Sequence, residues 1–148
     1  MKITFFGHAD FSEHGLKEKT IDILVKTIKD SEAEFLLGGY GKFDSFAYWC
    51  CQEIKKSDKK VKCTFVSPYL GKYLEDRKDT LLKLYDGIIY PPIENVYKKL
   101  AIEKRNFWII DESDFVVFYV QRNFGGAKKA MDYAKRKGKK FVNLYGIK

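Results

Sequence analysis

The sequence has few features of a membrane, secreted or metal-binding protein. Its longest unbroken apolar run covers residues 115–120, whereas a membrane helix needs about 18 or more apolar residues. Four apolar residues and one lysine precede Gly7, too few for the apolar core of a secretory signal. Cys50, Cys51 and Cys63 form no CxxC pair, and no Cys or His set has zinc-ligand spacing. We therefore expect a reduced, cytoplasmic protein with no metal, no cofactor and no membrane contact.

Positive charge is concentrated at one end of the chain. The 148 residues include 28 Lys and Arg against 20 Asp and Glu, a net charge of +8. Residues 128–148 alone carry eight basic residues against one acidic residue, which accounts for +7. Such a segment is typical of a solvated lysine face, or of an edge that attracts phosphates or nucleic acid. The length and a hydrophobic content of 45% indicate one folded domain.

Hydrophobic periodicity predicts alternating strands and helices. Glycine or proline ends several of the elements, and Asp44 is a predicted N-cap. The charged stretch 72–83 fits either a short helix or a loop. Gly138 is predicted to close the last helix. The predicted strands are 2–6, 34–37, 61–66, 87–90, 115–120 and 141–144, and the predicted helices are 16–28, 44–56, 94–111 and the segment opened by Gly125 and Gly126.

This alternation predicts an α/β fold, a Rossmann-like three-layer α/β/α sandwich with a mostly parallel sheet. In such sheets ligands bind outside the carboxyl ends of the strands, where the strand order reverses. Phe46 and Trp49 widen the apolar face of the helix at 44–56 beyond what a surface helix needs. We take this width as a sign that a second subunit covers the helix, so we expect a homodimer.

Three turns at predicted strand ends are candidate ligand-binding turns, and two of them contain paired glycines. Glycine lets backbone N–H groups approach an oxyanion closely, and the following helix N-terminus favours negative charge. The glycines equally suit tight turns with no ligand. Residues 39–44 read GxGxxD, which is not a dinucleotide fingerprint, and Lys42 lacks the following Ser or Thr of a P-loop. The turns contain Gly7 and His8, then Gly38, Gly39, Gly41 and Asp44, then Gly125, Gly126 and Ala127.

Arg105 and Asn106 stand out in the predicted helix at 94–111, because apolar residues flank them. The predicted apolar stripe of this helix is Val96, Leu100, Phe107 and Ile110, with Glu103 on the same stripe. Polar groups set among apolar residues need partners. Arginine suits a bidentate grip on phosphate or carboxylate, although an ion pair within the fold explains it as well.

In order and spacing, these residues resemble the SLOG superfamily, which joins the DNA-processing protein A fold to the Lonely Guy enzymes. The resemblance spans residues 3–144 and implies that residues 1–148 form a single SLOG-like nucleotide-binding domain. Members bind nucleotides or nucleotide-derived molecules, some of them as signals in defence against phage. The resemblance implies a nucleotide site lined by Gly38, Gly39, Gly41, Asp44, Arg105, Gly125 and Gly126. It rests on Gly7-His8-x-Asp10-Phe11, Gly38-Gly39-x-Gly41-x-x-Asp44, Arg105-Asn106, residues 113–117 and Gly125-Gly126-Ala127.

The enzymes of the superfamily carry PGGxGTxxE at the last turn, and its Glu acts with an upstream Arg to cleave a nucleoside monophosphate. Here Arg105 keeps the arginine, and Asp132 stands in the place of the Glu. Phe124, Lys128 and Lys129 replace the Pro, Gly and Thr. Arg105 and Asp132 are therefore the candidate catalytic residues if the protein is an enzyme.

Three functions follow as hypotheses. The first is binding of a small nucleotide-type ligand such as AMP, ADP-ribose or NAD through the glycine-rich turns and Arg105. The second is a nucleoside 5′-monophosphate N-glycosidase, a phosphoribohydrolase of the Lonely Guy type. The third is non-specific nucleic-acid binding through the basic C-terminal segment, which the sequence allows but does not favour.

Overall fold

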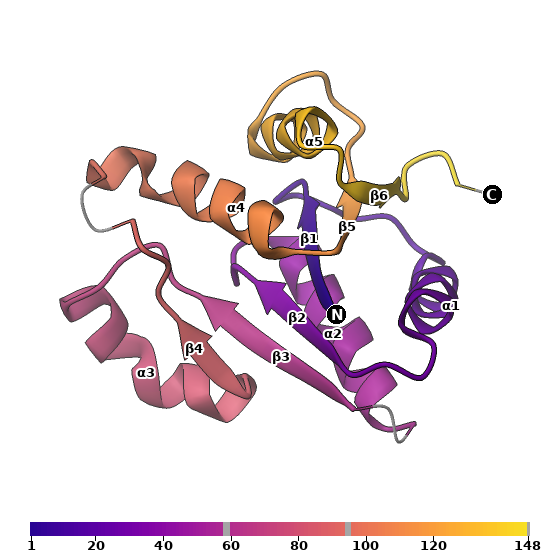
Figure 1. The fold of residues 1–148 in the computed structure, drawn as a ribbon, viewed down its shortest axis with the longest axis horizontal. Helices are drawn as coiled ribbons and strands as arrows, with labels where there is room; N and C mark the ends of the chain where they lie inside the picture. The colour runs from indigo at the N-terminus through magenta and orange to yellow at the C-terminus, as the bar shows by residue number, and fades with distance from the viewer. Residues whose placement is uncertain (58–59, 94–95, 148) are drawn as a thin grey trace.

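The centre of the computed structural model is a six-stranded sheet, which is parallel throughout (Figure 1). The structure describes residues 1–57, 60–93 and 96–147. The strands lie in the order β4-β3-β2-β1-β5-β6. Their bounds are β1 Lys2–Gly7, β2 Ala33–Leu37, β3 Val61–Val66, β4 Gly87–Ile89, β5 Phe115–Tyr119 and β6 Lys140–Asn143.

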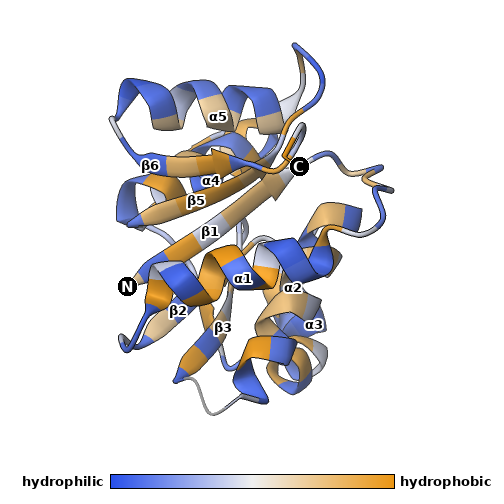
Figure 2. Cartoon of the chain, turned by 90° about the vertical axis from the view of Figure 1, so that its right-hand side faces the viewer, coloured by the Kyte–Doolittle hydropathy of each residue, from blue (hydrophilic) through white to orange (hydrophobic). Residues whose placement is uncertain are grey.

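Helices cover both faces of this sheet, which gives the predicted three layers. One cluster of buried side chains packs α1 and α2 against the sheet, and a second cluster packs α4 and α5 against it. Figure 2 shows apolar strands between these helix layers. No helix within the described ranges is long and apolar enough to cross a membrane. The helices are α1 Lys17–Ile28, α2 Lys42–Lys55, α3 Lys72–Leu84, α4 Ala101–Glu112 and α5 Gly126–Arg136, with a 3₁₀ turn at Lys98–Leu100 before α4.

Most strands and helices agree with the sequence prediction to within two residues. The apolar run at 115–120 is the buried strand β5, which pairs with both β1 and β6. Gly138 follows α5 with a φ of +66°, as predicted for a helix-closing glycine. The charged stretch after residue 72 is a helix, α3, although none of its residues is buried.

The start predicted for the helix at 94–111 is wrong. Glu94 lies outside the described residues, Val96 is not helical, and α4 begins only at Ala101. The buried residues of α4 are Ala101, Arg105, Ile109 and Ile110, so only Ile110 of the predicted stripe is buried in the helix. Leu100 lies in the 3₁₀ turn that precedes α4 and is 39% exposed.

The prediction that Asp44 is a helix N-cap is also wrong. Helix α2 begins at Lys42, after Gly41 with a φ of +89°. The Lys42 N–H donates to the Ala9 carbonyl at 2.9 Å, so the loop after β1 fixes the helix start. Asp44 lies in the first turn, where its carboxylate accepts the Tyr40 N–H at 2.8 Å.

The apolar flank of α2 is partly explained within one chain. The Phe46 ring lies 5.1 Å from Phe11 and 5.5 Å from Phe43, in an aromatic cluster under the loop after β1. Trp49 remains 59% exposed. The width of the face therefore does not require a second subunit, and the homodimer stays a prediction.

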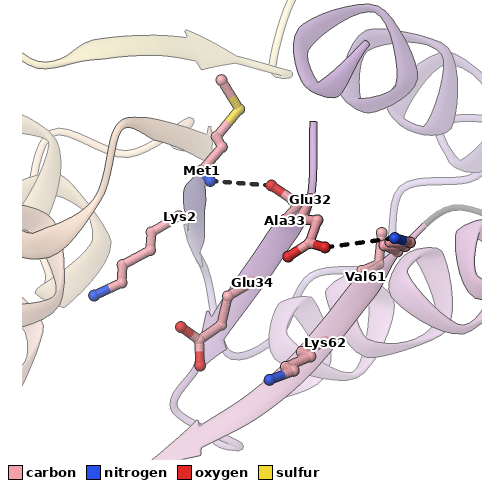
Figure 3. Close-up of a pocket in the computed structure, with 8 residues that line it drawn as sticks. Met1, Lys2, Glu32, Ala33, Glu34, Val61 and Lys62 are labelled. Carbon is pink, nitrogen blue, oxygen red and sulfur yellow. Dashed lines mark hydrogen bonds and ion pairs between the residues drawn. The ribbon is translucent and has the colours of Figure 1, made fainter. Parts of the chain in front are cut away.

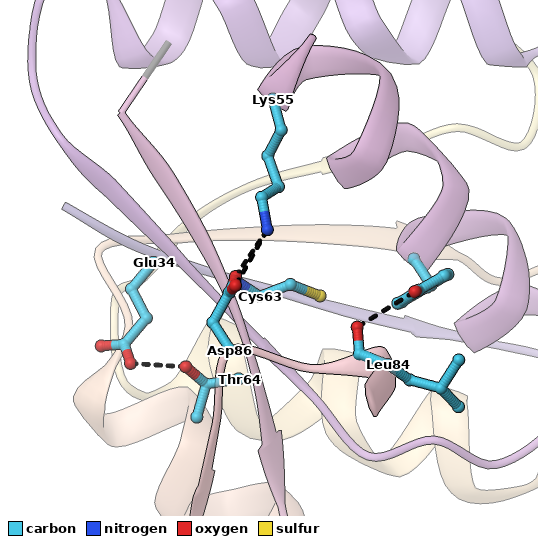
Figure 4. Close-up of polar contacts among 7 residues, drawn as sticks. Glu34, Lys55, Cys63, Thr64, Leu84 and Asp86 are labelled. Atoms are coloured by element: carbon cyan, nitrogen blue, oxygen red, sulfur yellow. Dashed lines mark hydrogen bonds and ion pairs between the residues drawn. The ribbon is translucent and has the colours of Figure 1, made fainter. Parts of the chain in front are cut away.

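Polar contacts attach the outer strands to the rest of the sheet (Figure 4). The Asp86 carboxylate accepts the Cys63 N–H at 2.8 Å and binds the Lys55 ammonium at 2.8 Å. On the neighbouring strands, the Thr64 hydroxyl donates to the Glu34 carboxylate at 2.7 Å. These bonds join the start of β4 to β3 and α2, so the edge strand is held in register.

Candidate functional site at the carboxyl edge of the sheet

A pocket of about 320 Å³ lies at the carboxyl ends of β1, β2 and β5. The strand order reverses between β1 and β5, because crossovers lead outward from β1 in one direction and from β5 in the other. This is the place where open α/β sheets bind ligands. Nine of the predicted site residues line the pocket: Gly7, His8, Gly38, Asp44, Arg105, Asn106, Gly125, Gly126 and Ala127.

Arg105 reaches the pocket from the buried face of α4. Its side chain is 5% exposed, and Nη1 donates to the carbonyls of Gly38 at 3.3 Å and Val66 at 3.2 Å. Nε donates to Asn106 Oδ1 at 3.2 Å. These bonds hold the guanidinium across the ends of β2 and β3. Nη2 has no hydrogen-bond partner among the described residues, and Arg105 lines the pocket, so the guanidinium can donate further hydrogen bonds to a ligand oxyanion.

Gly38 makes the position of Arg105 possible. A Cβ at residue 38 would lie 2.8 Å from Nη2 and 2.9 Å from Cζ of Arg105. The guanidinium therefore packs directly against the backbone that follows β2. The role of Gly38 is to admit this cation, which is a different role from the tight turn that glycine pairs usually make.

Gly39 and Gly41 do not line the pocket but shape the turn beside it. Both have positive φ, +68° and +89°. A Cβ on Gly41 would lie 2.8 Å from the Ala9 Cα, so the two loops touch at this point. The turn is closed by the Asp44 carboxylate, which accepts the Tyr40 N–H.

His8 connects the end of β1 to the loop after β5. Its Nε2 accepts the N–H groups of Gln121 at 2.9 Å and Arg122 at 3.3 Å. Because Nε2 is an acceptor, the ring is neutral and carries its proton on Nδ1. Burial and the nearby Arg122 charge lower the pKa of His8 and favour this neutral form. His8 is thus a turn residue bound to backbone, and its ring also forms part of the pocket wall.

Asp44 is the acidic group of the pocket. Burial raises its pKa to about 6, against the opposing effects of the Tyr40 N–H and the Arg105 charge. A carboxyl group with this pKa is protonated for part of the time near neutral pH. The pocket therefore tolerates an anion better than its formal charges suggest.

Positive potential also comes from the last turn and from α5. Gly125 precedes α5 and caps it without any side chain, which leaves the first N–H groups of an 11-residue helix facing the pocket. Arg122 lines the same wall and forms an ion pair with Asp10. Cations and helix N–H groups thus converge from α4, α5 and the loop between β5 and α5.

Two exposed aromatic side chains stand on the glycine turns at the pocket. Tyr40 lines the pocket and is 75% exposed, and Phe124 directly precedes Gly125 and is 70% exposed. Tyr40 and Arg122 line the pocket but were not predicted from the sequence, and neither was Phe124 beside it. Their nearness to the glycine turns was visible in the sequence, but their exposure was not.

Asp132 does not line the pocket in the described structure. It lies within α5 and accepts a hydrogen bond from Lys128 Nζ at 2.9 Å, in an i,i+4 ion pair. Arg105 and Asp132 are therefore not brought together at the pocket, although each was a candidate catalytic residue.

The basic C-terminal segment lies mostly at the other end of α5. Helix α5 is about 16 Å long, and the pocket is at its first turn. At its far end Lys139 Nζ donates to the carbonyls of Asp111 at 2.9 Å and Ser113 at 3.0 Å, which end α4. Part of this charge thus stabilises a helix terminus. Lys148 lies outside the described residues.

A second hollow, of about 510 Å³, opens at the amino ends of β1, β2 and β3 (Figure 3). Its polar groups are largely paired with one another: the Met1 amino group donates to the Glu32 carbonyl at 3.0 Å, and Lys60 Nζ lies 3.8 Å from the Glu32 carboxylate. The described residues that line it include no glycine and no helix N-terminus, so the carboxyl edge is the better candidate.

Comparisons with known proteins bear on the fold of the chain. No family model matches the chain. It is 25% identical over 138 residues to the uncharacterized SPbeta prophage-derived protein YoqJ of Bacillus subtilis (strain 168), covering 82% of this chain and 81% of that protein.

Two solved structures of DNA processing protein A are similar to the chain. The protein from Helicobacter pylori, which binds single-stranded DNA, aligns with a TM-score of 0.61 and 18% identity, over 95% of this chain and 63% of its own. The protein from Streptococcus pneumoniae aligns with a TM-score of 0.62 and 13% identity, over 95% of this chain and 48% of its own. The chain thus spans less than two thirds of either protein. It has the Rossmann-like fold of DNA processing protein A, in agreement with that part of the sequence resemblance.

Proposed function

We propose that the protein binds single-stranded nucleic acid, with one phosphate in the carboxyl-edge pocket and bases stacked on the aromatic side chains beside it. The observation that carries the proposal is the combination of a buried Arg105 in the pocket wall, the exposed ring of Tyr40 in the same wall, and the exposed ring of Phe124, which precedes the pocket residue Gly125. Cations that bind the backbone and aromatic rings that stack on bases are the two elements of single-strand binding.

The rings favour a single strand over a duplex. Bases in a duplex are already stacked and paired, so they do not present a face to Tyr40 or Phe124. The Helicobacter pylori protein of similar fold binds single-stranded DNA, which supports the same ligand class here.

A free nucleotide of the AMP, ADP-ribose or NAD type is the second candidate. The pocket of about 320 Å³ is concave and has the volume of a small-ligand site. Arg105, the first turn of α5 and one of the two rings would bind a mononucleotide with the same chemistry. The N-glycosidase hypothesis has less support, because Asp132 pairs with Lys128 outside the pocket.

Fluorescence anisotropy with a labelled oligothymidylate of about 20 nucleotides tests the proposal, since single-strand sites cover about 4–16 nucleotides per domain. We expect binding that weakens between about 50 and 200 mM salt. We expect Phe124→Ala and Tyr40→Ala each to weaken it by about 5- to 150-fold, the range for one lost stacking contact.

Trp49→Ala is the matched control, because Trp49 is 59% exposed on α2 and does not line the pocket. It should leave the affinity unchanged. Equal binding of a duplex of the same length, or an equal loss in Trp49→Ala, would contradict the proposal. Calorimetry with AMP, ADP-ribose and NAD identifies the second candidate if only these ligands bind.

A further inference from the structure

Besides the carboxyl-edge pocket and the hollow at the amino edge, a groove of about 310 Å³ lies between the loop after β3 and the segment that leads into α4. Three tyrosines, Tyr69, Tyr73 and Tyr90, line it together with Lys72 and Lys98. No acidic residue is among the described residues that line this groove. The described residues that line the groove therefore combine aromatic rings with cations.

The tyrosines form an ordered cluster flanked by cations. The rings of Tyr69 and Tyr73 lie 5.1 Å apart, edge to face at 80°. Lys98 Nζ lies 5.6 Å from the Tyr69 ring centroid, and Arg77 Cζ lies 4.1 Å from that of Tyr73. The buried Ser67 fixes the backbone of Tyr69, since its Oγ donates to the Tyr69 carbonyl at 2.6 Å and lies 3.3 Å from the Tyr69 nitrogen.

The groove adjoins the carboxyl-edge pocket through Arg105 and the first turn of α4. Ala101 lines the groove, and Ile102, the next residue, lines the pocket. Arg105 Nη1 donates to the carbonyl of Val66, the residue before Ser67. A strand that leaves the pocket over the start of α4 therefore meets the tyrosines next.

We propose that this groove is a second subsite for single-stranded nucleic acid, in which Tyr69 and Tyr73 stack on bases and Lys98 and Lys72 contact backbone phosphates. The inference rests on the proposed function, because it extends the strand whose phosphate occupies the pocket. It predicts that affinity depends on strand length: a dinucleotide fills the pocket alone, whereas a longer strand reaches the groove.

The test compares the affinities of a dinucleotide and of a strand of about 12 nucleotides. Tyr69→Ala and Tyr73→Ala should each weaken binding of the longer strand by about 5- to 150-fold and leave dinucleotide binding unchanged. Tyr73→Phe keeps the ring and should bind as the wild type does. Its behaviour separates lost stacking from a folding defect.

Lys98 and Lys99 provide a matched pair, because both are exposed and adjacent but only Lys98 lines the groove. Lys98→Ala should reduce the slope of log affinity against log salt by about 0.7, the value for one phosphate contact of a single strand. Lys99→Ala should leave the slope unchanged.

The outcomes separate the two proposals. Equal effects of Lys98→Ala and Lys99→Ala, or full affinity for the longer strand in Tyr69→Ala, would overturn the second subsite while the pocket keeps its ligand. Failure of every oligonucleotide to bind would overturn the proposed function and the subsite together. If ultracentrifugation shows that the wild type self-associates and Tyr69→Ala does not, the groove is a protein interface and the inference is wrong.

Discussion

Replacing Gly38 with alanine tests the packing on which the site depends. The added Cβ would stand 2.8–3.0 Å from three atoms of the Arg105 guanidinium. The backbone of Gly38 is not in the left-handed region, so alanine causes no conformational strain of its own. A guanidinium at the end of a flexible side chain usually moves aside. Here it is 5% exposed and bonded to two strand ends, so movement breaks those bonds.

The magnitude follows from the bonds that are lost. Hydrogen bonds to charged groups contribute about 1.5–3 kcal/mol each, and both carbonyl bonds of Arg105 are long, at 3.3 and 3.2 Å. Two bonds at the lower end of that range give a loss of about 3 kcal/mol in the free energy of unfolding. Ligand affinity should fall as well, because Nη2 leaves the pocket wall.

Urea unfolding followed by tryptophan fluorescence measures the loss. Gly87→Ala is the control, since a Cβ at Gly87 meets nothing within 4 Å, and it should change stability by less than about 1 kcal/mol. In an Arg105→Met background the cost of Gly38→Ala should differ strongly from its cost in the wild type, because the two residues are in contact. A Gly38→Ala variant as stable as the wild type, with full affinity, would refute the reasoning.

Three further predictions concern titratable groups. The pKa of Asp44 is raised to about 6 from 3.8, so the folded state holds the proton more tightly than the unfolded state does. The free energy of unfolding of the wild type should therefore fall by up to about 3 kcal/mol as pH rises from about 4 to 6. Asp44→Asn should remove this fall in urea titrations, and it should bind phosphate more tightly at neutral pH. The pKa of His8 is lowered from 6.5, so its contribution to the free energy of unfolding is present above that pH and is lost as pH falls. His8→Ala should remove this acid dependence. It should also lower the free energy of unfolding by about 1–3 kcal/mol at pH 7, because two N–H groups lose their acceptor. Asp86→Ala should cost about 1–3 kcal/mol in thermal or urea unfolding, because it leaves the Cys63 N–H unpaired, and an unchanged midpoint would contradict this role.

The fold could be predicted from the sequence because its signals are local. A continuous apolar run marks β5, and glycines end β1 and α5. The start of α4 could not be predicted, because Val96 and Leu100 have helical spacing, yet Val96 is not helical and Leu100 belongs to the 3₁₀ turn before the helix. The start of α2 is likewise fixed by a contact with Ala9, which is distant in sequence.

The site could be predicted in part. Glycine pairs and an arginine among apolar residues identified the carboxyl edge, and the topology brought them together. The separate roles of Gly38 and Gly41 depend on what lies opposite each glycine, which spacing does not reveal. Tyr40 and Phe124 were missed because aromatic residues in a single sequence are more often core than surface.

The two walls of the pocket are far apart along the chain. One wall comes from residues 5–44 and the other from residues 102–127. During synthesis the first wall therefore leaves the ribosome well before the second exists. A nascent chain that stops before α5 has no assembled pocket, so capture of the proposed ligand reports that synthesis has passed residue 127 and that the two walls have folded together.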